Sequence, residues 1–169
     1  AGFISWDNLA EQDVFALNAS LPFELNSWWS AYFNLSGSYL DNQADYGNGA
    51  VVDVQAWTYN IFTQNTFTLG NGYKGEISGW YSGPGVWGGV FKYDPSYSLN
   101  IGIQKKFMNK LNVKLSLKDI TFQSGWSGSS EFNGLQGFGN GNWDSRGAAL
   151  SLSYDFGNKK VKSRKRRTR

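Results

Sequence analysis

The stretch SYSLNIGIQKKFMNKLNVKLSLK, residues 96–118, alternates apolar and polar residues on both sides of a short polar interruption. The apolar positions of its two halves are Tyr97, Leu99, Ile101 and Ile103, then Leu111, Val113, Leu115 and Leu117. A period of two predicts β-strands with one apolar face each. The intervening residues 108–110 predict a tight turn, because Asn109 tolerates the positive φ that such turns need. The stretch therefore predicts an antiparallel β-hairpin.

The same alternation recurs along the chain and predicts five further strands. The seven predicted strands cover residues 15–25, 29–39, 57–69, 73–82, 97–104, 111–118 and 148–156. Polar Thr63 and Asn65 interrupt the third strand. We find no helical periodicity, and no run of about 18 apolar residues predicts a transmembrane helix. The sequence thus predicts an all-β fold.

The connections between these strands alternate between short and long. Short turns are predicted at residues 26–27, 70–72 and 108–110, and long loops rich in Gly and aromatic residues at roughly 41–52, 83–95 and 122–144. An antiparallel meander with short turns at one edge and long loops at the other gives this alternation, which is typical of outer-membrane barrels. We therefore predict about seven antiparallel up-and-down transmembrane β-barrel strands.

The polar positions of these strands hold mostly Ser, Asn and Gly, which are small enough to line a crowded or water-filled interior. Aromatic residues gather near the short turns (Phe23, Trp28, Trp29, Phe67, Tyr73, Phe107, Phe156) and toward the long loops (Tyr39, Trp57, Tyr59, Tyr81). Two such bands are expected at the two lipid–water interfaces of a barrel. Strands also favour aromatics in general, and a soluble sandwich of two sheets is the alternative.

The charges are distributed unevenly along the chain. Of the 16 Lys and Arg residues, eight lie within residues 159–169, so residues 1–158 carry eight basic against 13 acidic residues, or −5. We interpret residues 157–169 as a basic periplasmic tail, which follows the aromatic strand end at Phe156 and keeps its charges outside the hydrocarbon. A basic end on an acidic body does not indicate a nucleic-acid-binding domain, so we expect no nucleic-acid partner.

The chain contains neither His nor Cys. The commonest general base and metal ligand are therefore missing, as is any Ser/His/Asp or Cys/His arrangement. The sequence indicates no enzyme, no cofactor and no catalytic or metal-ligating residue. Asp41, Asp45 and Asp53 offer oxygen ligands for Ca²⁺, but no loop motif spaces them, and we interpret them as solvated loop acids.

Several stretches carry a resemblance to a known family: GEISGWYSGPGVWGGVFKYDPSYSLNIGIQKKFMNKLNVKLSLKDI (75–120), NWDSR (142–146) and LSYDFGNKKVKSRKR (152–166). SWDNLAEQDVFALNASLPFEL (5–25) and the tryptophan pair at 28–29 precede them. In this order they resemble the C-terminal region of the Bacteroidetes outer-membrane β-barrel family, which is related to TonB-dependent receptors. The resemblance covers nearly the whole chain.

The resemblance implies a barrel of about 22 strands around a plug, of which residues 1–156 are the C-terminal part. It implies a receptor or transporter for a nutrient too large for porins, in the outer membrane of a Gram-negative cell, with the C-terminus in the periplasm. The implied partners are outer-membrane lipid, the rest of the barrel and its plug, an energy-coupling periplasmic protein and a surface lipoprotein.

Ligand recognition is expected in the long loops, where many folds carry their functional residues. The two later loops hold the candidate ligand-binding aromatics Trp87, Phe91, Trp126, Phe132 and Trp143. Such rings either stack on a sugar ring or pack the loop against itself, and both interpretations stay open. Lys74 and Glu76 share the polar side of one strand, with Asp119 and Arg146 near the opposite rim. We expect these charges to pair across strands or to contact a plug, not to catalyse.

Three alternatives to a large barrel stay open. A complete small barrel would use residues 3–9 as an eighth strand, although a spanning strand needs about 9–11 residues; a full-length product of 18.9 kDa would favour it. A soluble carbohydrate-binding β-domain would stay in aqueous buffer without detergent. A basic-tailed nucleic-acid binder would show salt-dependent DNA affinity that is lost when residues 159–169 are removed.

Overall fold

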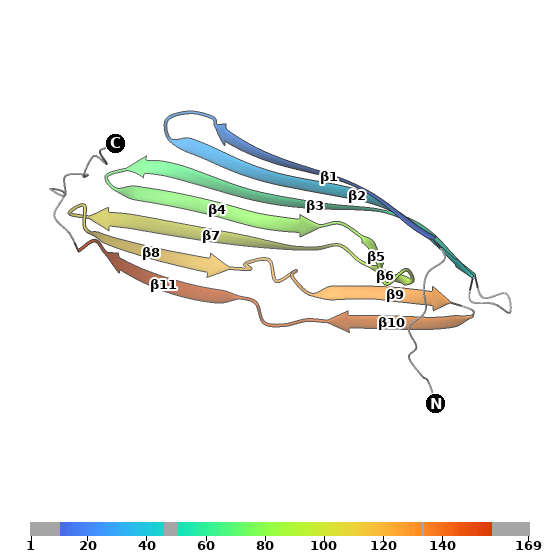
Figure 1. Ribbon diagram of the computed structural model, residues 1–169. Coiled ribbons are helices and arrows are strands. Elements are labelled where there is room, and N and C mark those ends of the chain that lie inside the picture. The colour runs from blue at the N-terminus through green and yellow to red at the C-terminus, as the bar shows by residue number, and fades with distance from the viewer. Residues whose placement is uncertain (1–10, 46–50, 133, 157–169) are drawn as a thin grey trace, which may run out of the picture.

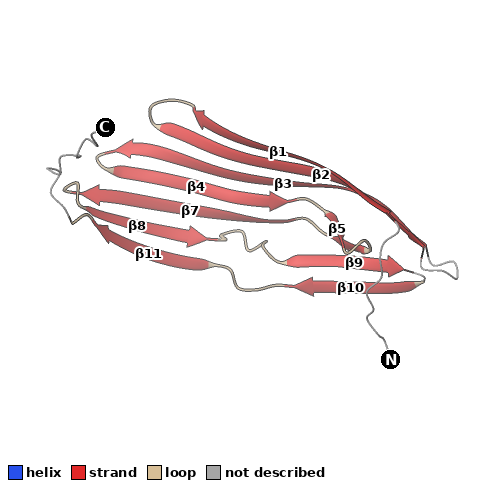
Figure 2. Cartoon of the chain, viewed as in Figure 1, coloured by secondary structure: helices blue, strands red, loops and turns tan. Residues whose placement is uncertain are grey.

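The computed structural model describes residues 11–45, 51–132 and 134–156. Within these ranges the chain forms strands joined by turns and loops, without a helix (Figure 1 and Figure 2). The strands are β1 (Glu11–Glu24), β2 (Trp29–Asp45), β3 (Val51–Gly70), β4 (Tyr73–Ser82), β5 (Gly85–Trp87), β6 (Phe91–Tyr93), β7 (Ser96–Phe107), β8 (Leu111–Lys118), β9 (Trp126–Phe132), β10 (Leu135–Gly141) and β11 (Gly147–Tyr154). All pairings among them are antiparallel, which confirms the predicted all-β class.

Seven strands form one sheet in the order β1-β2-β3-β4-β7-β8-β11, which Figure 1 shows as a curved wall. Each of the seven predicted strands corresponds to one strand of this wall. The largest difference is in β3, which begins at Val51 instead of residue 57 because residues 51–56 pair with an equally extended end of β2. Among the described residues β1 and β11 each pair with one neighbour, so the wall does not close into a barrel.

The register of the wall places the predicted apolar parities on one side, which we call the apolar face. One row across six strands runs through Trp29, Phe67, Gly75, Ile103, Leu115 and Leu150. A slip by one residue would move the apolar set of a strand to the opposite face. The observed pairing therefore confirms the predicted sidedness of the strands.

No second layer covers the apolar face within the part of the chain that the structure describes. Large side chains such as Phe15, Trp57 and Leu152 are exposed, and the buried hydrophobic residues of the described ranges are Ala31, Ala44 and Val52. A soluble sandwich would pack two apolar faces about 10 Å apart and gain about 25 cal/mol for each Å² removed from water. That layer is missing here, so the sandwich alternative is not supported and the apolar face needs an apolar surrounding.

The predicted tight turns join β1 to β2, β3 to β4 and β7 to β8, and they form one edge of the wall, the short-turn rim. In the first turn, Asn26 Oδ1 accepts hydrogen bonds from the backbone N–H groups of Trp28 and Trp29, at 3.1 and 2.8 Å. In the second, Gly72 has a φ of 79°, and a Cβ on it would lie 2.8 Å from the carbonyl oxygen of Lys106. Glycine is therefore needed there both for its dihedral angle and for the close approach of β7.

The three predicted long loops are wrong in part, because strands occupy them. Most of residues 41–52 belong to the ends of β2 and β3, and residues 46–50 lie outside the described ranges. The region 83–95 contains the β5–β6 hairpin and the region 122–144 the β9–β10 hairpin. The period of two is missing there because β5 and β6 have only three residues each. Strands β9 and β10 consist mostly of Gly and polar residues, so neither of their faces is uniformly apolar.

The two hairpins form a second sheet of four strands in the order β10-β9-β6-β5. Figure 1 shows β9 and β10 beyond the ends of β8 and β11, at the rim opposite the short turns, which we call the long-loop rim. The second sheet is attached to β3, where the Gly83 N–H donates to the Tyr59 carbonyl at 2.7 Å and the Tyr93 hydroxyl lies 3.3 Å from Thr58 Oγ1. It thus lengthens the wall at this rim.

Candidate functional site

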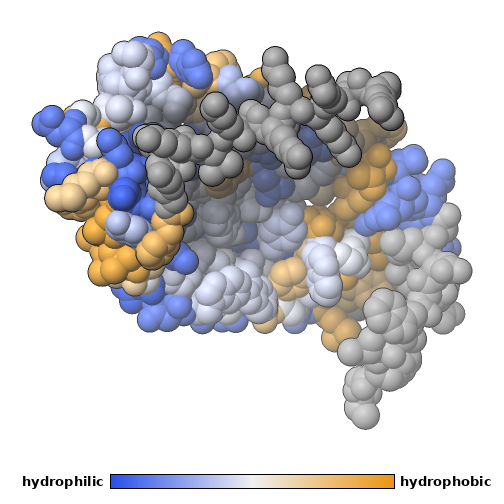
Figure 3. Space-filling view, turned by 60° about the vertical axis from the view of Figure 1, so that its left-hand side comes forward, coloured by the Kyte–Doolittle hydropathy of each residue, from blue (hydrophilic) through white to orange (hydrophobic). Residues whose placement is uncertain are grey.

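The side of the wall opposite the apolar face, the polar face, carries small hydrophilic side chains. One row across five strands consists of Asn18, Ser36, Asn60, Ser82 and Ser96. Figure 3, which brings the short-turn rim forward, shows a recess at the middle of the molecule, with hydrophilic and intermediate residues inside it. The polar face can therefore hold polar molecules, and two cavities lie on it.

Charged side chains of the polar face pair across strands. Lys114 of β8 reaches over β7 to Glu76 of β4, with Nζ 3.2 Å from Oε2. Its side chain passes Gly102, where a Cβ would lie 3.4 Å from Lys114 Cε, so the missing side chain leaves room for the lysine. The prediction that the charge of Glu76 would pair across strands is confirmed.

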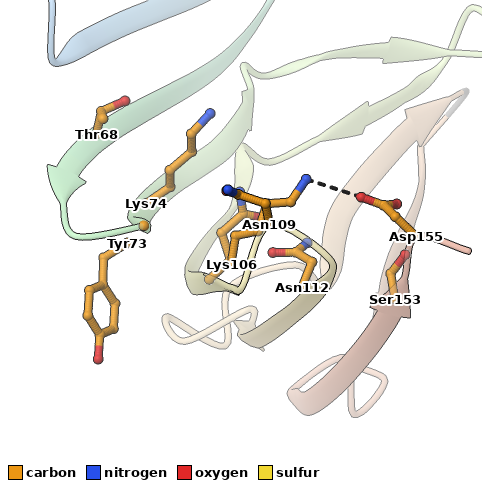
Figure 4. Close-up of a pocket in the computed structure, with 10 residues that line it drawn as sticks. Thr68, Tyr73, Lys74, Lys106, Asn109, Asn112, Ser153 and Asp155 are labelled. Atoms are coloured by element: carbon orange, nitrogen blue, oxygen red, sulfur yellow. Dashed lines mark hydrogen bonds and ion pairs between the residues drawn. The ribbon is translucent and has the colours of Figure 1, made fainter. Parts of the chain in front are cut away.

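The first cavity, of about 470 Å³, lies on the polar face at the short-turn rim (Figure 4). We call it the lysine pocket, and its lining includes Lys74, Gln104, Lys106, Asn109, Asn112 and Asp155. Lys106 pairs with Asp155, with Nζ 3.1 Å from Oδ2, whereas Lys74 forms no ion pair with another described residue. One positive charge of the pocket is therefore uncompensated, which attracts anionic groups.

The second cavity, of about 500 Å³, lies on the polar face toward the long-loop rim. We call it the tryptophan cleft, and its lining includes Trp80, Ser98, Asn100, Lys118, Trp126 and Trp143. Its volume falls within the range of about 300–1,000 Å³ that is usual for small-molecule sites. Three indole rings stand here beside hydroxyl, amide and ammonium groups, a combination that can both stack on a ligand and hydrogen-bond to it.

Trp126, the first residue of β9, lies across two glycines of β10. A Cβ on Gly139 would be 3.1 Å from its Cη2, and a Cβ on Gly141 would overlap its Nε1, so a larger residue at either position would displace the ring. Phe91 meets the ring edge-on, with centroids 6.1 Å apart. Trp126 is nevertheless 45% exposed. The indole is therefore supported from below and from the side, with surface left open to the cleft.

Asp119 holds both ends of the β9–β10 hairpin below the cleft. Its carboxylate accepts hydrogen bonds from the hydroxyls of Ser124, before β9, and of Ser145, after β10, and from Thr121 at 3.3 Å. The bond from Ser145 lowers the pKa of Asp119 below its ordinary value of 3.8, although burial, which leaves it 2% exposed, acts in the opposite direction. The bonds from Ser124 and Thr121 add to the lowering. Asp119 therefore stays ionised at neutral pH, with its oxygens occupied.

The structure brings together three of the five predicted ligand-binding aromatics. Trp126 and Trp143 line the tryptophan cleft, and Phe91 supports Trp126. Trp87 lies exposed at the end of β5, and Phe132, at the far end of β9, lines a separate cavity beside β3. Ligand binding by these residues stays a prediction, and Trp87 and Phe132 do not belong to the cleft.

Sequence reasoning missed the strand residues of the cleft. Trp80 has the polar parity of β4, between Ser78 and Ser82, where a large aromatic breaks a row of small side chains. That break is the signal that could have found it, because an indole on a hydrophilic surface indicates a contact. Lys118 and Asn100 gave no such signal, since a lysine or an asparagine fits a solvated face equally well.

The remaining charged candidates do not form a common centre. Asp119 is buried, whereas the guanidinium of Arg146 lies 4.0 Å from the ring centroid of Phe122. Within the described ranges, no group of three or more Asp, Glu, His or Cys residues could hold a metal ion. The structure therefore does not support a Ca²⁺ site at Asp41, Asp45 and Asp53.

A comparison with protein families shows to which family the chain belongs. The family described as outer membrane protein beta-barrel family matches residues 2–154, nearly the whole chain. The chain belongs to this family. Neither the curated proteins nor the solved structures gave a match. The described residues include no helix that is long and apolar enough to cross a membrane.

In a member of the outer membrane β-barrel family, the apolar face meets lipid. Trp28, Trp29 and Phe67 stack near the short-turn rim with centroids 5.8–6.1 Å apart, and Tyr39 and Trp57 lie 5.0 Å apart nearer the other rim. Trp29 and Tyr39 are ten positions apart on β2, which is about 33 Å of strand at about 3.3 Å per residue. At a tilt of about 40° this spans roughly 25 Å, the height of the apolar band in such barrels. The structure thus places these aromatics at two levels of the wall, and their position at the two lipid–water interfaces stays a prediction.

Proposed function

We propose that this chain is the C-terminal part of a larger outer-membrane β-barrel, a receptor or transporter of the TonB-dependent type for a nutrient ligand. Residues 1–156 belong to the barrel in this proposal. Residues 157–169, which lie outside the described ranges, form a basic periplasmic tail. The resemblance of residues 75–120 and 142–146 to Bacteroidetes proteins supports both the transporter type and a Bacteroidetes origin.

The open edges of the wall carry this proposal. Leu17 on β1 and Leu152 on β11 are 77% and 67% exposed, whereas Leu35 and Ile101 inside the sheet are 38% and 37% exposed. The outer strands lack the neighbour that shields the central ones. Because lipid offers no hydrogen bonds to an unpaired strand edge, we expect further strands beside both β1 and β11, which gives a barrel of more than seven strands.

The difference between the two rims supports an orientation of the wall. Outer-membrane barrels have short turns in the periplasm and longer loops outside. Strand β11 ends at the same rim as the three short turns (Figure 1). In the proposed orientation the C-terminus is therefore periplasmic, the tryptophan cleft lies toward the outside and the lysine pocket lies toward the periplasm.

The position of the tryptophan cleft supports ligand capture. It lies on the polar face, which is the inner side in a closed barrel, and near the rim that we assign to the outside. The partners in this proposal are the remaining barrel strands and their plug, an energy-coupling periplasmic protein and a surface lipoprotein. The proposal includes no catalytic step and no nucleic-acid partner.

Detection of the native polypeptide in purified outer membranes tests the proposal. We expect a species much larger than the 18.9 kDa of this chain, with nutrient uptake that stops when the proton gradient is collapsed. Cells that lack the energy-coupling periplasmic protein are the matched control and should also lose uptake. A native product of 18.9 kDa that inserts alone would refute the proposal and support a complete eight-stranded barrel. Uptake that continues without the gradient would refute the transporter type.

A further inference from the structure

The tryptophan cleft exposes one positive charge beside its indole rings. Lys118 is exposed, lines the cleft and forms no ion pair with another described residue. The one carboxylate among the residues described in the lining is Asp119, which is buried and accepts hydrogen bonds from Ser124 and Ser145. A ligand in the cleft therefore meets an open ammonium group and no open carboxylate.

The three indole rings come from separate parts of the fold. Trp80 belongs to the wall, Trp126 to the second sheet, and Trp143 to the segment between β10 and β11. The ring of Trp126 is fixed by Gly139 and Gly141, so little side-chain entropy is lost when a ligand stacks on it. Indoles offer a large apolar surface with a polar N–H edge, which suits the apolar faces of pyranose rings.

The rest of the lining is rich in small groups that form hydrogen bonds. Ser82 and Ser96 lie along the wall. Ser98 is buried against Asp119, and Asn100 Oδ1 accepts a hydrogen bond from the Asp119 backbone N–H at 2.9 Å, which leaves the Asn100 amide N–H groups for a ligand. A hydroxyl both donates and accepts, and an amide does so through two different atoms. Such a lining can form hydrogen bonds with several hydroxyls of a ligand at once. An apolar ligand would leave these polar groups of the cleft without partners, which costs binding free energy.

We propose that the tryptophan cleft binds an acidic oligosaccharide, a short chain of pyranose rings that carries carboxylate or sulfate groups. The indoles stack on the rings, and Lys118 contacts the anionic group. Ser82, Ser96 and the amide N–H groups of Asn100 bind the hydroxyls. A neutral oligosaccharide would displace water from Lys118 without replacing it by a partner, so it binds more weakly. This inference rests on the proposed function for the place of the cleft inside the barrel mouth.

Further along the polar face, the charges agree with an anionic ligand. Lys114 and Lys106 are each compensated by one carboxylate, from Glu76 and Asp155. Lys74, in the lysine pocket, is uncompensated among the described residues, like Lys118. The polar face of β4, β7 and β8 is therefore positive near both rims, and charges on an interior face set the selectivity of a barrel.

Calorimetric binding to the intact native protein in detergent tests this proposal. The probes are trigalacturonate, trimannuronate and a sulfated galactotriose, each beside its neutral counterpart, galactotriose or mannotriose, and a hexaglutamate peptide. We expect at least one acidic trisaccharide to bind about tenfold more tightly than its counterpart. Added salt should weaken the binding of the acidic trisaccharide and leave the affinity for the neutral one unchanged. The peptide should not bind, because it has no ring to stack.

Substitutions at two positions of the cleft, with Lys74 as the control position, assign the effect to the cleft. Lys118→Met should remove the preference for the acidic trisaccharide, whereas Lys74→Met, on the same face at the other rim, should keep it. Trp126→Ala should lower the affinity for acidic and neutral trisaccharides alike by about tenfold. Trp126→Phe should lower both affinities less, because it keeps an aromatic ring.

Three results would overturn the inference: equal affinity for acidic and neutral trisaccharides, a preference that persists in Lys118→Met, or binding of the peptide as tightly as the best sugar. Energy-dependent uptake in a protein that fails these tests would leave the proposed function standing. Sugar binding by a native 18.9 kDa product would refute the proposed function and keep the cleft.

Discussion

The seven-stranded wall and the four-stranded sheet at its long-loop rim are held together by different means. In the wall, strands of 8–20 residues align rows of apolar side chains that face lipid. In the smaller sheet, strands of 3–7 residues rely on close contacts with glycine and on one buried carboxylate. The smaller sheet depends on the contact of Trp126 with Gly141 and on the hydrogen bonds to Asp119. The apolar row of the wall that contains Leu115 and Ile103 has no contacts of these kinds.

This difference shows that the surroundings of each sheet decide which residues it needs. A face in contact with lipid accepts nearly any apolar side chain, because lipid adapts to its shape. A short sheet at the rim has water on its surface and must be held by specific contacts within the protein. Single substitutions should therefore act through the membrane in the wall and through local geometry in the smaller sheet.

The largest effect is expected for a charge placed on the apolar face. Ile77→Lys in β4 would expose an ammonium group to lipid and should destabilise the folded protein by about 2–4 kcal/mol. Ser78→Lys, one residue further and on the polar face, is the matched control and should be nearly neutral. Urea unfolding of the native protein in lipid vesicles measures both, and equal losses would contradict our assignment of the two faces.

In the smaller sheet, Gly141→Ala should displace the ring of Trp126. The added Cβ would overlap Nε1 of the indole, and such overpacking costs about 1–3 kcal/mol. Limited proteolysis should then cut within residues 122–144 while the wall stays protected. Gly147→Ala is the control, since a Cβ there would meet nothing within 4 Å. Unchanged cleavage in Gly141→Ala would show that the ring is not seated on β10.

The bonds to Asp119 should make the smaller sheet sensitive to acid. Its pKa is lowered in the folded state, so its contribution to stability is present above its unfolded pKa, near 3.8, and is lost as the pH falls through the lower folded value. Amide hydrogen exchange in β9 and β10 should accelerate below this pH before exchange in β2 and β3. Asp119→Asn should remove the pH dependence, and Asp144→Asn should keep it. An equal response of both sheets would contradict the role of Asp119.

The smallest effect is expected for the ion pair on the polar face. Lys114 and Glu76 are about one-third exposed, and pairs in contact with water contribute less than about 1 kcal/mol. Lys114→Met, Glu76→Gln and the double variant form a cycle whose coupling energy can be measured by urea unfolding. A coupling well above that value would mean that the interior of the wall is dry.

The wall was largely predictable from the sequence, and its attachments were not. Alternation such as Leu111, Val113, Leu115 marks a strand because one face meets an apolar medium. The strand β10, with the sequence LQGFGNG, shows no such pattern. Its residues are chosen for contact with one ring, because Gly139 and Gly141 leave room for the indole of Trp126. The aromatics of the cleft were found at Trp126 and Trp143, whereas Trp80 was missed because a single position cannot outweigh the alternation around it.

Two long connections, between β4 and β7 and between β8 and β11, affect the order in which the wall assembles. Strands β2, β3 and β4 each pair with the strand just before them, after one short connection. Strand β11 pairs with β8 only after residues 119–146. Closing a longer loop costs more entropy and delays the contact it enables. We expect pulse-labelled amides in β2 and β3 to gain protection before those in β11, and simultaneous protection would contradict this order. The carboxyl-terminal strand would then be the last of the seven to join, after the rim structure that carries the tryptophans has formed.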